Sequence, residues 1–182
     1  MSLQQILDAN EAFLARKQKW HDRYIELAKL ISTWSKDPGH HVGSVIVDND
    51  GRILSVGYNG FARGIADTEE RLVDRNVKLN YTIHSEMNAL HNAAHSGVSL
   101  QHASIYVYGL PVCSECAKGI IQSGIRKVYM CSPARDIGQW KASFELTASM
   151  FDETHIEWKL WENESSSSEP ILPTLPLLWL DD

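Results

Sequence analysis

The order in which strand-like and helix-like segments alternate is the feature that most constrains the fold of this chain. Five segments carry strand character, and they span residues 42–47, 53–56, 103–110, 125–132 and 156–161. The first two are joined by Asn49-Asp50-Gly51, which is a strong signal for an antiparallel hairpin. The last three alternate with helical segments, and strands that a helix connects pair in parallel. The sequence therefore predicts an α/β sandwich around a mixed, five-stranded sheet.

The helical segments account for most of the remaining chain. They span residues 1–35, 84–97, 113–124 and 138–151. Apolar residues recur near the helical period in the first of them, and Asp37-Pro38-Gly39 is expected to end it. Residues 61–81 are polar and lack a clear apolar stripe, so we expect a long connection with partial helix. Long connections of this kind usually carry function.

The chain is acidic and has an ordinary globular composition. Its 182 residues carry a formal net charge of −6, with 43% hydrophobic and 22% charged residues. Proteins that follow a phosphate backbone show a basic balance, so a long nucleic acid is not an expected partner. No segment approaches the ~18 consecutive apolar residues of a membrane span, and the N-terminal segment lacks a signal-peptide pattern. We therefore expect a cytoplasmic protein with no membrane partner.

Composition divides the chain into one domain and a short tail. Residues 1–162 have the length and patterning of a single domain. Residues 163–182 form a polar, serine-rich linker that continues into a proline- and leucine-rich segment, in which the prolines exclude a regular helix. We expect this apolar tail to pack on the body of the protein or on a neighbouring subunit.

Cys113 and Cys116 form a C-x-x-C pair at the start of a predicted helix. Cytosolic thiols stay reduced and three cysteines are an odd number, so a structural disulfide is not expected. A redox pair would follow the first strand of a βαβ unit, whereas this pair lies in the second half of the chain. A helix N-terminus lowers the pKa of a thiol and so favours zinc ligation. Because the third cysteine, Cys131, has no C-x-x-C partner, a four-cysteine site is excluded and a histidine must complete the site.

Of the eight histidines, His84 is distinguished by Glu86, which follows two residues later in the first turn of a predicted helix. Parallel helices of successive βα units begin at the same end of the sheet, so His84 can meet Cys113 and Cys116 around one ion. Three protein ligands leave a fourth position open for water, as in catalytic zinc sites. Glu86 would lie beside that position and move protons without binding the metal. Neither the H-x-E motif nor the C-x-x-C motif alone is specific for a catalytic zinc site, but the two together are.

The H-x-E and P-C-x-x-C motifs are the signature of zinc nucleobase deaminases. From about Tyr24 to Trp158 the sequence resembles the cytidine and deoxycytidylate deaminase superfamily, and most closely its deoxycytidylate (dCMP) deaminases. The resemblance rests on the stretches SKDPGHHVGSVIVDNDGRILSVGYNGF, YTIHSEMNAL and CSECAKGIIQSGIRKVYM. It implies a three-layer α-β-α sandwich with a central mixed five-stranded sheet. It also implies zinc-dependent hydrolysis of dCMP to dUMP and ammonia.

The resemblance also implies roles for individual residues. His84, Cys113 and Cys116 would bind zinc, and Glu86 would move protons while water attacks C4 of the cytosine ring. The substrate contacts that it implies are Asn59, Tyr81, Ser85, Pro111 and Val112. Asn59 would contact a sugar hydroxyl, although a turn asparagine explains the same residue. Backbone groups near Ser85, where the family usually has alanine, would hold the base edge, and Tyr81 would line the pocket unless it is a core tyrosine.

Two departures from the family pattern bear on the substrate. Trp34 stands where dCMP deaminases usually carry an arginine suited to a phosphate, and tryptophan offers no guanidinium fork. Lys36, Arg63 or an arginine of a neighbouring subunit would then bind the 5′-phosphate, or the substrate lacks one. An extra residue, Val112, precedes Cys113 where the family runs proline directly into cysteine, and it would reshape the pocket wall.

Alternatives remain open at the level of the sequence. A deaminase of cytidine, deoxycytidine, a free base or a modified pyrimidine is the nearest one, and Trp34 favours it. An RNA-editing enzyme is a poorer match, because the chain is acidic and lacks a basic run. A non-catalytic, zinc-stabilised nucleotide-binding module would leave Glu86 without a use. The resemblance alone implies a homo-oligomer, commonly a hexamer, with dCTP and dTTP as allosteric effectors.

Overall fold

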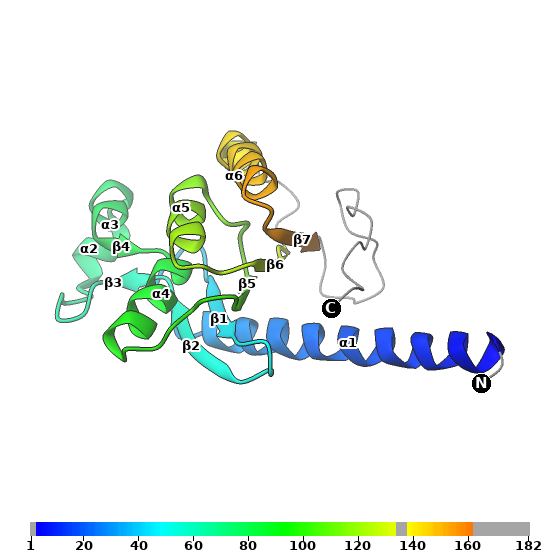
Figure 1. Ribbon diagram of the computed structural model, residues 1–182. Coiled ribbons are helices and arrows are strands. Elements are labelled where there is room, and N and C mark those ends of the chain that lie inside the picture. The colour runs from blue at the N-terminus through cyan, green and yellow to red at the C-terminus, as the bar shows by residue number, and fades with distance from the viewer. Residues whose placement is uncertain (1–2, 134–137, 162–182) are drawn as a thin grey trace.

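The computed structural model describes residues 3–133 and 138–161 (Figure 1). Its centre is a five-stranded sheet in the order β2-β1-β5-β6-β7. The strands are β1 (Gly43–Val47), β2 (Ile53–Tyr58), β5 (Ser104–Tyr108), β6 (Lys127–Cys131) and β7 (Glu157–Trp161). β1 runs antiparallel to both β2 and β5, whereas β5, β6 and β7 run parallel to one another. The predicted mixed five-stranded sheet is confirmed.

Helices cover both faces of this sheet, which confirms the three-layer architecture (Figure 1). The main helices are α1 (Leu3–Ser32), α4 (Ser85–His95), α5 (Ser114–Gln122) and α6 (Lys141–Glu153). α1 packs on one face along β1 and β5, over a buried cluster rich in tyrosine. α4, α5 and α6 lie on the other face, over a larger and mainly aliphatic core. The functional residues described below come from the N-terminal ends of α4 and α5.

Two glycines let helices approach the β1–β2 hairpin closely. A Cβ atom on Gly43 would lie 2.1 Å from the carbonyl oxygen of Ala28 in α1. A Cβ atom on Gly57 would lie 2.4 Å from the backbone nitrogen of Ala89 and 2.4 Å from the carbonyl oxygen of Ser85, both in α4. The backbones of the two helices therefore rest directly on opposite faces of the hairpin. This contact fixes the start of α4 against β2.

α4 also covers the outer edge of β2, the last strand of the sheet on that side. The hydrogen-bonding register with β1 turns the carbonyls of Val56 and Tyr58 away from that strand. Asn88 Nδ2 donates to the Tyr58 carbonyl at 2.7 Å, and Asn92 Nδ2 donates to the Val56 carbonyl at 2.9 Å. The two asparagines lie one turn apart on the same face of α4. The helix thus satisfies two carbonyls of the edge strand.

The polar connection after β2 folds into two short helices and a two-stranded ribbon. In chain order these elements are β3 (Gly60–Phe61), α2 (Glu69–Val73), α3 (Arg75–Tyr81) and β4 (Thr82–Ile83). The Asp74 side chain caps α3 by accepting from two backbone N–H groups of its first turn. The partial helix predicted for residues 61–81 is confirmed. The ribbon was not predicted, because strands of two residues leave no alternating pattern.

The expected end of the first helix differs from what the structure describes. α1 ends at Ser32, before Asp37-Pro38-Gly39, because the hydroxyls of Ser32 and Thr33 bond back to carbonyls three residues earlier. The predicted linker and tail at residues 163–182 lie outside the described residues. Among the helices of residues 3–133 and 138–161, none is long and apolar enough to cross a membrane.

Candidate metal centre

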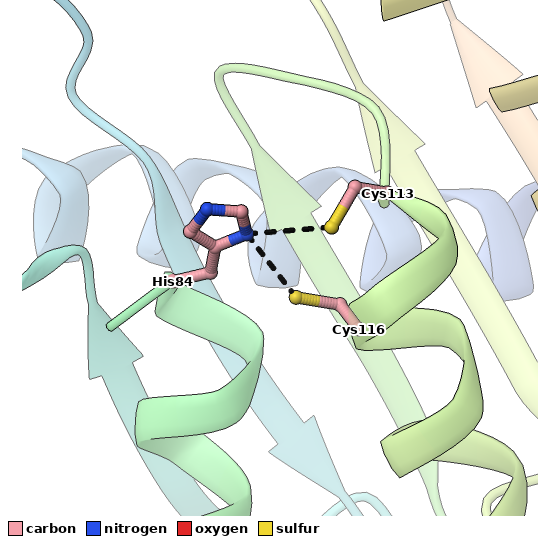
Figure 2. A group of neighbouring side chains, drawn as sticks. All are labelled: His84, Cys113 and Cys116. Atoms are coloured by element: carbon pink, nitrogen blue, oxygen red, sulfur yellow. Dashed lines mark hydrogen bonds between the residues drawn. The ribbon is translucent and has the colours of Figure 1, made fainter. Parts of the chain in front are cut away.

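The N-terminal ends of α4 and α5 bring three possible metal ligands together (Figure 2). His84 is the N-cap of α4, Cys113 is the N-cap of α5, and Cys116 lies in the first turn of α5. Nδ1 of His84 lies 3.4 Å from the Sγ atom of each cysteine. The structure thus assembles the group of three residues that the sequence selects, from segments about 30 residues apart.

The geometry of this group suits zinc. Tetrahedral zinc with Zn–S distances of about 2.3 Å and Zn–N distances of about 2.0–2.1 Å places a nitrogen and a sulfur ligand about 3.6 Å apart. The two nitrogen–sulfur distances here are 3.4 Å, and the three ligand atoms all lie within 4.8 Å of one another. Two thiolates and an imidazole are a typical donor set for zinc. Three protein ligands also leave one coordination position for water, as in catalytic zinc sites.

Without a metal, the three side chains differ in pKa. The Cys113 sulfur accepts hydrogen bonds from the Cys116 thiol and the His84 ring, which lower the pKa of Cys113 to about 4 despite burial. The hydrogen bond with Cys113 raises the pKa of His84 to about 9. The hydrogen bond to Cys113, together with burial, raises the pKa of Cys116. Because zinc binds the deprotonated forms, it must displace the protons that remain.

Glu86 lies in the first turn of α4 and is buried, with 4% of the residue exposed. Burial raises the pKa of its carboxyl group, which suits a group that takes up a proton and returns it. Ser85 Oγ donates to Glu86 Oε2 at 2.9 Å and lies 2.7 Å from Ser44 Oγ. The two serines therefore hold one carboxylate oxygen in place.

A cavity of about 160 Å³ opens beside His84, Cys113 and Glu86. Its wall comes from the loop before β1, from α3, from the starts of α4 and α5, and from the segment before α6. The rings of His40 and Trp140 meet edge to face in this wall, with centroids 5.1 Å apart. His84, Cys113 and the buried carboxylate thus line the same cavity.

Three of the predicted substrate contacts line this cavity, namely Asn59, Ser85 and Pro111. The Asn59 side chain accepts from the Val42 N–H and donates to the His40 carbonyl, both at 2.8 Å. Its amide therefore ties β2 to the loop before β1 and shapes the cavity wall. The backbone of Asn59 does not have the positive φ of a tight-turn asparagine. Its contact with a sugar hydroxyl stays a prediction.

Tyr81 and Val112 lie outside the cavity lining. The Tyr81 ring packs against Phe61, with centroids 5.6 Å apart, and beneath the Arg71 guanidinium at 4.9 Å. Val112 is fully buried in the aliphatic core, and its carbonyl accepts from Thr147 Oγ1 at 3.0 Å. Val112 therefore anchors the segment before α5 from outside the cavity lining.

The two cations predicted to contact a phosphate also lie elsewhere. Lys36 is exposed and pairs with Asp67 at 2.8 Å. Arg63 donates to Asn92 Oδ1 at 3.2 Å and lines a separate hollow on the outer face of α4. Trp34 is exposed and meets the Tyr58 ring edge to face. None of these three side chains contributes to the lining of the cavity.

Other cavity residues were missed from the sequence. Asp37 and His40 follow the first predicted helix in a turn, and Trp140 stands in a predicted helical segment, so the sequence pattern assigns none of them to the site. Arg75 and Lys78 come from the connection that showed no clear pattern, and both line the cavity from α3. The only available signal was their spacing of three residues, which places two cations on one face of a helix.

Comparison with known proteins gives consistent results. A family model described as the cytidine and deoxycytidylate deaminase zinc-binding region matches residues 18–132. The chain is 36% identical over 140 residues to an uncharacterized deaminase in the luxG 3′ region of Aliivibrio fischeri, covering 76% of this chain and 91% of that one. It is 36% identical over 144 residues to a probable deoxycytidylate deaminase of Caenorhabditis elegans, covering 78% and 69% of the two chains. The dCMP deaminase of cyanophage S-TIM5, solved with dCMP and dUMP, superposes with a TM-score of 0.60 at 26% identity, covering 76% and 94%.

Proposed function

Because the chain belongs to the cytidine and deoxycytidylate deaminase family, we propose that it hydrolyses dCMP to dUMP and ammonia, with zinc as its cofactor. The observation that carries this proposal is the position of Glu86. A buried carboxylate lines the same cavity as His84 and Cys113, two of the three residues suited to bind zinc. A purely structural zinc site has four protein ligands and no use for such a carboxylate. Probable deoxycytidylate deaminases among the relatives support dCMP as the substrate.

The metal ligands and Glu86 have different roles in the proposed reaction. His84, Cys113 and Cys116 hold the metal, which when bound supplies a water of lowered pKa as the nucleophile. Glu86 takes a proton from the attacking water and delivers it to the departing amino group. Its raised pKa favours uptake of the proton, because a carboxylate of higher pKa is a stronger base.

The cavity orients the substrate by its polar wall. Backbone groups at the start of α4, around Ser85 and Glu86, hold the edge of the base. Asn59 holds a sugar hydroxyl from the end of β2, with its amide fixed by two backbone hydrogen bonds. His40, from the loop before β1, and Trp140, from the segment before α6, enclose the bound nucleotide and exclude water.

The experiment that tests the substrate is ammonia release from zinc-loaded protein. The substrates are dCMP, CMP, deoxycytidine, cytidine and cytosine, each with and without dCTP. A strong preference for dCMP supports the proposal. Activity on the unphosphorylated substrates alone would replace it with the nearest alternative, which the exposed Trp34 at the family arginine position favours.

A matched pair of variants distinguishes an enzyme from a binding module. Glu86→Gln should retain zinc and fold but lose about 10²- to 10⁴-fold in kcat, because it removes the proton carrier. The control is Glu115→Gln, since Glu115 is exposed and pairs only with Lys118 among the described residues. If Glu86→Gln deaminates every cytosine substrate as fast as the wild type does, the chain is not a deaminase of this kind.

We also propose a cytoplasmic, homo-oligomeric enzyme. Its three cysteines are free thiols, and thiols that must stay reduced to bind zinc suit a reducing compartment. The family resemblance supports a hexamer that responds to dCTP and dTTP. Light scattering of the full chain, with each nucleotide and without, tests this directly. A mass of one chain under all conditions would remove the oligomer and leave the deaminase proposal standing.

A further inference from the structure

The cavity carries cationic groups that the deamination chemistry does not use. Arg75 and Lys78 line it from α3, whereas His84, Cys113 and Glu86 line it from the starts of α4 and α5. Base chemistry needs the second set only. A wall with two cations is what a phosphate group would require.

Arg75 and Lys78 face the cavity together because they lie three residues apart on one helix face. Their helix is held in place at its first turn by the Asp74 cap and followed directly by β4, which leads into His84. The position of the two cations is therefore coupled through a short, ordered segment to the position of the metal ligand.

Lys78 is buried and its ammonium group is fixed. Its Nζ atom donates to Asp37 Oδ1 at 2.7 Å, and only 11% of its side chain is exposed. Asp37 Oδ1 also accepts from the Gly39 and His40 N–H groups, at 2.7 and 3.2 Å. Burial raises the pKa of Asp37, but the hydrogen bonds from Lys78 and the two amides outweigh it, so that the pKa of Asp37 is lowered. An ammonium group has three donors, so Lys78 keeps two for a ligand.

Arg75 supplies the net positive charge. Asp37 neutralises Lys78, whereas none of the carboxylates whose side chains the structure describes forms an ion pair with Arg75. Its side chain is exposed at the cavity, so a guanidinium fork can meet two phosphate oxygens. An ionised Glu86 has the same sign of charge as a phosphate, so it would repel a phosphate from the zinc ligands and favour one orientation of the nucleotide.

On the premise of the proposed function, we infer that the Arg75–Lys78 face of α3 binds the 5′-phosphate and sets the preference for nucleotide over nucleoside. This assigns to α3 the contact that Trp34 does not provide. It also explains how the chain can act on a phosphorylated substrate while Lys36 and Arg63 lie outside the cavity.

The test compares kcat/KM for dCMP with kcat/KM for deoxycytidine in zinc-loaded full-length protein. Arg75→Gln should lower the ratio of the two by about 10- to 100-fold, because it removes a charged hydrogen-bonding partner. The double variant Asp37→Asn/Lys78→Met, which leaves no lone buried charge, should also lower the ratio. The matched controls Lys36→Gln and Arg63→Gln should change the ratio by less than about twofold, since both cations lie outside the cavity.

A binding measurement separates this inference from the proposed function. Calorimetry with dUMP and with deoxyuridine should show a dUMP preference that Arg75→Gln reduces by about the same factor as in the kinetics. An unchanged ratio in Arg75→Gln, or a drop in either control, overturns the inference. Wild-type protein that deaminates deoxycytidine as well as dCMP overturns it and leaves a deaminase. Zinc-loaded protein without activity on either substrate overturns the proposed function, and the dUMP preference still decides the role of Arg75.

Discussion

The Ser85 hydroxyl donates a hydrogen bond to Glu86 Oε2 across 2.9 Å, and Ser44 Oγ lies 2.7 Å behind it. Ser85→Ala removes the direct partner of the proton carrier, and we expect kcat to fall about tenfold at unchanged zinc content. Ser44→Ala is the matched control, because it leaves the bond between Ser85 and Glu86 in place and should cost less than about threefold. Equal losses in the two variants would show that this hydrogen bond does not position Glu86.

Zinc binding should release about two protons per metal ion at pH 7. One comes from His84, whose pKa is raised to about 9, and one from Cys116, whose pKa is also raised. Cys113, with a pKa of about 4, is already a thiolate at this pH. Calorimetry in buffers of different ionisation enthalpy measures the number, and zinc affinity should fall as the pH falls. Cys131→Ala should release the same number of protons, and a measured release of one or none would contradict this assignment.

His21 should make the protein sensitive to acid. Burial, aided by the nearby Lys159, lowers its pKa from 6.5 to about 4, and its Nδ1 lies 2.8 Å from the Tyr106 hydroxyl. A lowered pKa means that the unfolded chain binds the proton more readily, so stability is lost as the pH falls from about 6.5 to about 4. The loss is at most about 3 kcal/mol.

Urea unfolding at fixed zinc content measures this loss between pH 7 and pH 4. His21→Phe should flatten the profile in that window, because it removes the titrating group and keeps an aromatic ring beside Tyr129. His95→Gln, which changes an exposed histidine on α4, should follow the wild-type profile. If the free energy of unfolding of His21→Phe falls with pH as steeply as that of the wild type, other groups cause the acid sensitivity.

Gly57→Ala should destabilise the protein by at least about 2 kcal/mol, because the added methyl group would overlap the α4 backbone. The same overlap displaces the carbonyl of Ser85, so kcat should fall with stability. Gly60→Ala is the control, since its Cβ would have no neighbour closer than 3.6 Å. Chemical unfolding of both variants checks this, and a Gly57→Ala protein as stable as Gly60→Ala would mean that α4 can move away from β2.

The sequence was sufficient to predict the sheet and the meeting of His84, Cys113 and Cys116, because both leave local patterns. Apolar runs mark the strands, and the ligands stand at helix starts that short motifs identify. The α3 wall of the cavity left no such pattern. Lys78 meets Asp37, 41 residues earlier in the chain, and an ion pair at that separation has no periodicity.

The predicted phosphate contacts failed to reach the cavity for a related reason. Lys36 lies next to Asp37 in sequence, yet in the turn after α1 neighbouring side chains diverge, and Lys36 reaches Asp67 instead. Tyr81 precedes His84 by three residues but turns toward Phe61 in the β3–β4 ribbon. Proximity in sequence to a catalytic motif does not determine which side chains enter the site when a short strand intervenes.

The two asparagine amides of α4 on the edge of β2 bear on how this chain meets other chains. Exposed edge strands recruit further strands, which is a common route to aggregation. Here a strand of another chain would have to displace Asn88 and Asn92 from the carbonyls of Tyr58 and Val56 before it could pair with β2. The side chains that close this edge sit on the helix that begins with His84 and Glu86. The helix that presents His84 and Glu86 to the candidate metal centre therefore also hinders the addition of a further strand to the sheet.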